Sequence, residues 1–145
     1  MTDREAIIDH TRSWGRAYLN GDIDEILSHY SDDALMITFD GIIAKGHDKI
    51  RSIYELWLKV GNPLELNYET VDVVVNGDMA YHVLKWHGIF QEPYGNEMMC
   101  GACQSILRRQ DNGQWLWVSE VVCADIDSIE VLDTLPNISA DLNVI

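Results

Sequence analysis

The chain has 145 residues, of which 47% are hydrophobic, and a formal net charge of −14. This length and composition predict one globular domain with a core of its own and exclude intrinsic disorder. The negative charge argues against partners such as nucleic acid or an anionic membrane surface, because both require clustered Lys and Arg.

The cysteine content and the start of the chain predict a cytoplasmic protein. The segment "MTDREAIIDH" is acidic and lacks the cationic and apolar pattern of a secretion signal, and no apolar run approaches the length of a membrane span. An odd number of cysteines indicates reduced thiols. Cys100 and Cys103 form a C-x-x-C pattern within an expected strand, where this spacing directs the two side chains to opposite faces, so we expect no metal site there.

The first part of the chain carries helical patterns. A helix is expected over 3–19, where apolar and aromatic side chains recur every three or four residues, and Gly21 follows its end. A short second helix follows Asp22 in the capping-box pattern "DIDE". A third helix is expected between Gly46 and Gly61, because its apolar stripe stops at the segment "GNP".

A strand is expected over 34–40, between the second and third helices. Its alternation places Met36, Thr38 and Asp40 on one face. Gly41 then provides a turn.

The rest of the chain reads as long hairpin strands separated by the turn signals "NGD" and "DNG". These strands are expected over 64–75, 79–90, 97–110 and 114–123. Helices followed by meandering strands indicate the α+β class, and long twisted hairpins predict a sheet that curls around a helix and leaves a pocket. We expect one domain over 1–123 and an acidic tail over 124–145, which either belongs to that domain or forms a dimer arm.

Four motifs carry a resemblance to a known family. They are "AYLNGDIDEILSHYSDDALM", "GHDKIRSIYELW", "NGDMAYHV" and "RRQDNGQWLWVSEV", which together span Ala17 to Val121. In this order the motifs resemble the nuclear transport factor 2-like superfamily. The resemblance is greatest to its SnoaL-like branch, which also contains the ketosteroid isomerases. The resemblance implies a cone-shaped, cystatin-like fold in which a curved mixed β-sheet wraps around N-terminal helices. It also implies a pocket for a small apolar molecule and a homodimer formed through the sheet.

Asp40 is the candidate general base. It shares the expected strand face with Thr38, so its carboxylate would reach the pocket near the rim and could move a proton. The alternative is that Asp40 and Gly41 form an ordinary solvated turn. The resemblance to ketosteroid isomerases implies a base at the position of Thr38, and this sequence departs from that pattern.

Tyr18 and His82 are the candidate donors. The resemblance implies that a tyrosine on the first helix faces the ligand, where Tyr18 would stabilise a developing oxyanion. His82 shares a strand face with Trp86, which suits a mostly apolar site with few polar groups. For both residues the alternative is a structural role within the core.

Glu120 lies in an apolar stretch of the last strand, where an unpaired buried carboxylate would be costly. It is either a second acid or the partner of Arg108 or Arg109, and we expect the ion pair. The walls of the pocket are expected to come from Trp14, Tyr30, Met36, Thr38, Tyr54, Trp57, Trp86 and Trp117.

Two functions fit these features. The first is an isomerase, cyclase or dehydratase that acts by proton transfer on an apolar carbonyl or polycyclic substrate, without a cofactor or metal. No G-x-S-x-G, phosphate-binding glycine loop or H-E-x-x-H motif points to another chemistry. The second is a non-catalytic ligand-binding or dimerisation domain, which the absence of an acid at Thr38 favours.

Overall fold

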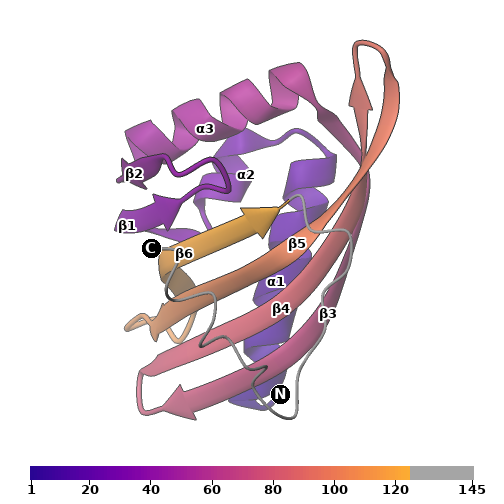
Figure 1. The fold of residues 1–145 in the computed structure, drawn as a ribbon. Helices are drawn as coiled ribbons and strands as arrows, with labels where there is room; N and C mark the ends of the chain where they lie inside the picture. The colour runs from indigo at the N-terminus through magenta and orange to yellow at the C-terminus, as the bar shows by residue number, and fades with distance from the viewer. Residues whose placement is uncertain (125–145) are drawn as a thin grey trace, which may run out of the picture.

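The computed structural model describes residues 1–124, so the tail predicted over 124–145 lies, apart from Ala124, outside the described residues. None of the helices among them has both the length and the apolar character needed to cross a membrane. The elements, shown in Figure 1, are helices α1 (Asp3–Leu19), α2 (Ile23–Leu27) and α3 (His47–Val60) and strands β1 (Tyr30–Ile37), β2 (Ile43–Lys45), β3 (Asn62–Asn76), β4 (Met79–Glu92), β5 (Gly95–Arg109) and β6 (Trp115–Ala124).

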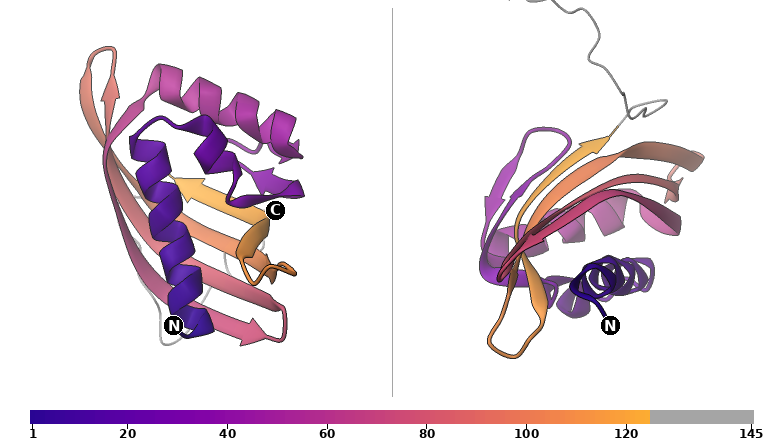
Figure 2. Two further views of the ribbon diagram at one scale, coloured as in Figure 1. Left: turned by 180° about the vertical axis from the view of Figure 1, so that it is seen from behind. Right: turned by 90° about the horizontal axis from the view of Figure 1, so that it is seen from below.

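All six strands belong to one mixed sheet in the order β2-β1-β6-β5-β4-β3. The β1–β6 pair is parallel, and the other neighbouring strands are antiparallel. The sheet is strongly curved and does not close, and α1 lies against its concave side (Figure 2). This arrangement confirms the predicted α+β fold, in which a curved mixed sheet wraps around N-terminal helices.

Helix α1 has the bounds that the sequence predicts. Thr2 caps it, since its hydroxyl accepts from the backbone of Glu5 while the Glu5 side chain accepts from the backbone of Thr2. The buried residues of the helix are Ile7, Thr11, Gly15, Ala17 and Tyr18. Their spacing of three and four residues forms the single face that packs onto the sheet.

Strand β1 ends earlier than predicted. The strand was expected over 34–40, but Thr38 begins a turn in which its carbonyl accepts from the amide of Gly41 at 3.0 Å. Gly41 has φ of +84°, a conformation that glycine adopts without steric cost. The chain then returns as the short strand β2, which pairs with β1 and which the sequence analysis did not predict.

Strand β6 contains a bulge that changes which of its residues face inward. Leu107 of β5 pairs with Trp117, whereas the preceding Ile106 pairs with Ser119, so Val118 is an extra residue. One extra residue shifts the alternation of side chains along a strand. Trp117 and Glu120 are therefore both buried, although simple alternation predicted that they face opposite sides.

Candidate functional site

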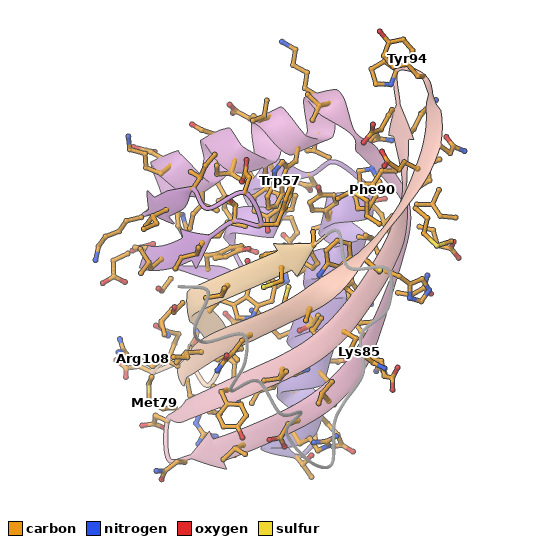
Figure 3. All side chains as sticks on the ribbon, viewed as in Figure 1. Trp57, Met79, Lys85, Phe90, Tyr94 and Arg108 are labelled. Carbon is orange, nitrogen blue, oxygen red and sulfur yellow. The ribbon has the colours of Figure 1, made fainter. Side chains whose placement is uncertain are left out.

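The concave side of the sheet and the helices enclose a cavity of about 380 Å³. Ligand sites are typically mostly apolar cavities of roughly 300–1,000 Å³ with a few polar groups. Figure 3 shows Trp57 of α3 and Phe90 of β4 at the same end of the molecule as Tyr94, which marks the tip of the β4–β5 hairpin. Both Trp57 and Phe90 line the cavity, and Val60 and Glu97 mark its exposed side.

The structure brings most of the predicted pocket residues together. Seven of them line the cavity, and they come from α1, α3 and the sheet: Trp14, Tyr18, Met36, Tyr54, Trp57, Trp86 and Trp117. Four others are absent from its lining: Tyr30, Thr38, Asp40 and His82. Tyr30 is buried and does not line the cavity, but its hydroxyl donates a hydrogen bond to Glu120, which does.

Asp40 lies exposed in the turn after β1. Its carboxylate accepts a short hydrogen bond from the hydroxyl of Thr38, whose oxygen in turn accepts from the amide of Ile42 at 3.0 Å. Thr38 is buried, but these bonds hold its hydroxyl in the turn. This is the geometry of the solvated-turn alternative, and a catalytic role for Asp40 stays a prediction.

Glu120 is the buried carboxyl group of the cavity lining, which also includes Glu92 and Glu97 nearer its exposed side. Its residue is only 4% exposed, and it lines the cavity from β6. Burial raises the pKa of Glu120 to about 7, while the hydrogen bond from Tyr30 acts in the opposite direction. The expected ion pair with Arg108 or Arg109 is wrong: Glu120 bonds to Tyr30 instead, and Arg109 pairs with two other carboxylates.

A directed chain of hydrogen bonds holds Glu120 in place. The indole N–H of Trp14 donates to the hydroxyl of Tyr54 at 3.0 Å, and the hydroxyls of Tyr54 and Tyr30 lie 2.5 Å apart. Tyr30 donates to Oε1 of Glu120 at 2.8 Å. Because a hydroxyl has a single proton, Tyr30 must accept from Tyr54, so every donor in the chain points toward the carboxyl group.

This direction determines which oxygen of Glu120 can titrate. Oε1 is held as an acceptor by Tyr30. Oε2 has no partner within residues 1–124, and the side chain that carries it lines the cavity. A proton on Glu120 is therefore carried by Oε2, where a bound molecule can exchange it.

Further polar groups surround the carboxyl group. Ser105 is directly opposite Glu120 in the β5–β6 register, is buried and lines the cavity. The hydroxyl of Tyr18 has no hydrogen-bond partner in the described chain, and burial raises its pKa. The indole nitrogens of Trp86 and Trp117 are buried without a partner among the described residues. A ligand with acceptor groups would satisfy these donors.

His82 is buried on a different side of α1. Its ring nitrogens contact the hydroxyls of Thr11 at 3.4 Å and Thr70 at 2.9 Å. Burial, and to a smaller extent the positive charge of Arg4 nearby, lower the pKa of His82 to about 4. A neutral histidine bonded at both nitrogens matches the structural alternative, and its proposed catalytic role stays a prediction.

Comparison with solved structures shows the same fold in bacterial proteins. The ketosteroid isomerase-like protein of Erwinia carotovora atroseptica has a TM-score of 0.76 and 18% identity, over 84% of this chain and 95% of that chain. A nuclear transport factor 2-like protein of Cytophaga hutchinsonii has a TM-score of 0.73 and 14% identity, over 86% and 99%. A cystatin-like domain of Nostoc punctiforme has a TM-score of 0.71 and 20% identity, over 98% and 91%. At these identities the likeness shows the fold alone.

Sequence comparisons give the family. A search of the curated proteins finds no match to this chain. The family model of the SnoaL-like domain matches residues 7–123, which is most of the chain and includes every residue of the cavity lining. The likeness to nuclear transport factor 2-like structures agrees with this match. The protein therefore belongs to the SnoaL-like domain family.

Proposed function

We propose that the protein transfers a proton on a small apolar carbonyl compound bound in the cavity, as an isomerase, cyclase or dehydratase that needs no cofactor. The observation that supports this proposal is Glu120, a buried carboxyl group with a pKa of about 7 inside an apolar cavity. A group that titrates near neutral pH serves equally well as acid and as base.

The proposed reaction begins when Oε2 of Glu120 removes a proton from the carbon next to the carbonyl. The electron pair of the broken C–H bond moves into an enolate, whose oxygen accepts a hydrogen bond from the hydroxyl of Tyr18. Glu120 then returns the proton to another carbon, which gives isomerisation. If the enolate instead expels a hydroxide from the neighbouring carbon, Glu120 protonates this leaving group and the reaction is a dehydration.

The test compares two isosteric variants, Glu120→Gln and Asp40→Asn. Each protein is incubated in D₂O with a panel of cyclic ketones, and incorporation of deuterium next to the carbonyl is followed by NMR. We expect exchange with the unchanged protein and with Asp40→Asn, and a loss of about 100-fold or more with Glu120→Gln, as removal of a general base predicts. Exchange that is lost in Asp40→Asn and kept in Glu120→Gln would transfer the role to Asp40.

Binding without turnover is the second candidate function. It is favoured by the residue at the position of the ketosteroid isomerase base, because Thr38 is no acid and its hydroxyl bonds within a turn. The indole groups of Trp86 and Trp117 in the cavity lining allow a fluorescence titration with the same ketones. Saturable quenching with no deuterium exchange for any bound ketone would support binding alone.

We also propose that the protein is a homodimer formed through the outer face of the sheet. Val74, Ile106 and Val121 are exposed large apolar side chains on strands β3, β5 and β6. Contiguous exposed apolar residues mark protein interfaces. Light scattering coupled to gel filtration should give twice the chain mass, and an Ile106→Glu variant should give the monomer mass.

A further inference from the structure

A second cavity of about 240 Å³ lies between α1 and the strands β3 and β4. Its lining combines residues of the helix with residues of the sheet: Ile8, Thr11, Arg12, Tyr68, Thr70 and His82. Figure 2 shows α1 lying across this part of the concave face. Thr11 and Tyr68 also line the large cavity and so form the wall between the two.

His82 leaves one threonine hydroxyl of this cavity with a proton to donate. A neutral imidazole has one N–H donor and one acceptor nitrogen. Because the two nitrogens contact Thr11 and Thr70, one threonine receives the N–H and the other donates its own proton to the ring. The threonine that receives the N–H keeps its hydroxyl proton, for which the described chain provides no acceptor.

Tyr68 contributes to the wall between the two cavities and not to the donors of the small one. Its hydroxyl is buried and has no hydrogen-bond partner within residues 1–124. It lies against the backbone of Gly15, where a Cβ atom would be only 2.3 Å from the hydroxyl oxygen.

Arg12 adds a positive charge to the cavity lining. Its side chain is 63% exposed, and its guanidinium lies 3.8 Å from the exposed carboxylate of Asp9, so this ion pair contributes little and leaves other N–H groups free for a ligand. Arg4, which lowers the pKa of His82, is a second cation nearby. None of the lining residues carries a carboxylate, although the whole chain has a net charge of −14.

We propose that this cavity binds the carboxylate group of a short-chain organic acid. The lining offers one threonine hydroxyl and the Arg12 guanidinium as donors, and charge-assisted hydrogen bonds to a carboxylate are stronger than bonds between neutral groups. The side chain of Ile8 provides an apolar contact for the carbon chain of the acid. The site is separate from Glu120 and does not depend on the proposed proton transfer.

The test is an NMR titration of the folded full-length chain with sodium acetate, at constant ionic strength maintained with sodium chloride. The imidazole ¹⁵N and ¹H signals of His82 report on the cavity. We expect saturable shifts with acetate, and affinity about tenfold lower in Arg12→Gln, which is the effect of about 1.4 kcal/mol. Arg16→Gln is the matched control, because Arg16 is exposed on the same helix and does not line the cavity.

Three results would contradict this site. Shifts that do not saturate, or that are equal in Arg12→Gln and Arg16→Gln, would show that the cavity holds water and only responds to bulk salt. A stronger response to inorganic phosphate than to acetate at equal concentration would reject the carboxylate class. Arg12 and Arg16 are both on the surface, so neither substitution should affect folding and the comparison between them is decisive.

Discussion

Tyr30 and Glu120 are 90 residues apart in the sequence and are joined by a 2.8 Å hydrogen bond in the core. The bond connects β1 with β6, which form the parallel pair of the sheet. It ties the position of the carboxyl group to the first strand, and through Tyr54 and Trp14 to helices α3 and α1. The geometry of the cavity and the ionisation of Glu120 are therefore coupled.

Replacing Tyr30 with Phe should raise the pKa of Glu120 further. The Tyr30 hydroxyl stabilises the ionised carboxylate, so its removal leaves burial as the dominant effect. The hydroxyl of Tyr54 also loses its acceptor, which should reduce the free energy of unfolding by about 1–3 kcal/mol. NMR titration of the Glu120 side-chain carboxyl measures the first effect, and urea denaturation measures the second.

Tyr81→Phe is the matched control for this substitution. Tyr81 donates a 2.6 Å hydrogen bond to Asp72 at the surface, so it also pairs a tyrosine with a carboxylate. Surface bonds of this kind contribute little, and the expected change in the free energy of unfolding is below about 0.5 kcal/mol. Equal effects of the two substitutions would contradict a special role for the buried chain of hydrogen bonds.

The buried carboxyl group should make the protein less stable as the pH rises from about 4.5 to about 7. Because the pKa of Glu120 is higher in the folded state, the folded protein binds more protons in this range than the unfolded chain does. The stabilisation that comes from protonated Glu120 is fully present below pH 4.5 and is lost as the pH rises past 7. As the pH rises across this range, the free energy of unfolding of Glu120→Gln should increase by about 3 kcal/mol relative to that of the unchanged protein.

Measurement of urea denaturation at several pH values checks this expectation. The informative quantity is the difference in the free energy of unfolding between Glu120→Gln and the unchanged protein, since other titrating groups cancel in it. Parallel curves for Glu120→Gln would mean that the carboxyl group titrates alike in the folded and unfolded chains.

His82 should have the opposite effect on stability. Its pKa is lowered from 6.5 to about 4, so the unfolded chain binds more protons between these values, and the contribution to stability is lost as the pH falls. As the pH falls from 6.5 to 4, the free energy of unfolding of His82→Gln should therefore decrease by about 1–3 kcal/mol less than that of the unchanged protein. This range allows for water that reaches the ring from the small cavity and screens its charge. His87→Gln, on the exposed face of the same strand, is the control, and a difference as large as that of His82→Gln would contradict the burial effect.

Local signals in the sequence determine much of this fold. The helical spacing and the Gly21 that follows predicted the bounds of α1, and the turn sequences at Gly77 and Gly113 predicted two of the hairpins. Both glycines have positive φ, as such turns require. Strand β2 has three residues, which is too short for an alternating pattern, and only its pairing with β1 defines it.

The aromatic residues that line the candidate site could be predicted from the sequence, but the role of Glu120 as its buried carboxyl group could not. Aromatic side chains at helical or strand spacing are expected to face inward, as Trp14 and Trp86 do. Glu120 was assigned to an ion pair with Arg108 or Arg109 because an unpaired buried carboxylate is costly. The bulge at Val118 changes which residues of β6 face inward, and no signal in the local sequence marks this shift in the β5–β6 register. A lone acid in the apolar segment "WLWVSEVV" was the available clue.

Gly15→Ala should destabilise the protein, although alanine is the better helix former. In an unconstrained helix this substitution stabilises by about 0.5–1 kcal/mol. Here the new Cβ would lie 2.3 Å from the Tyr68 hydroxyl oxygen and 3.0 Å from two ring carbons, so either the ring or the helix must move. Overpacking of this kind costs about 1–3 kcal/mol, which outweighs the gain in propensity.

Urea denaturation of Gly15→Ala, Tyr68→Phe and the double variant measures the coupling, because removal of the hydroxyl relieves the closest contact. The double variant should recover at least half of the loss caused by Gly15→Ala, whereas simple additivity of the two single losses would show that Tyr68 does not restrict this position.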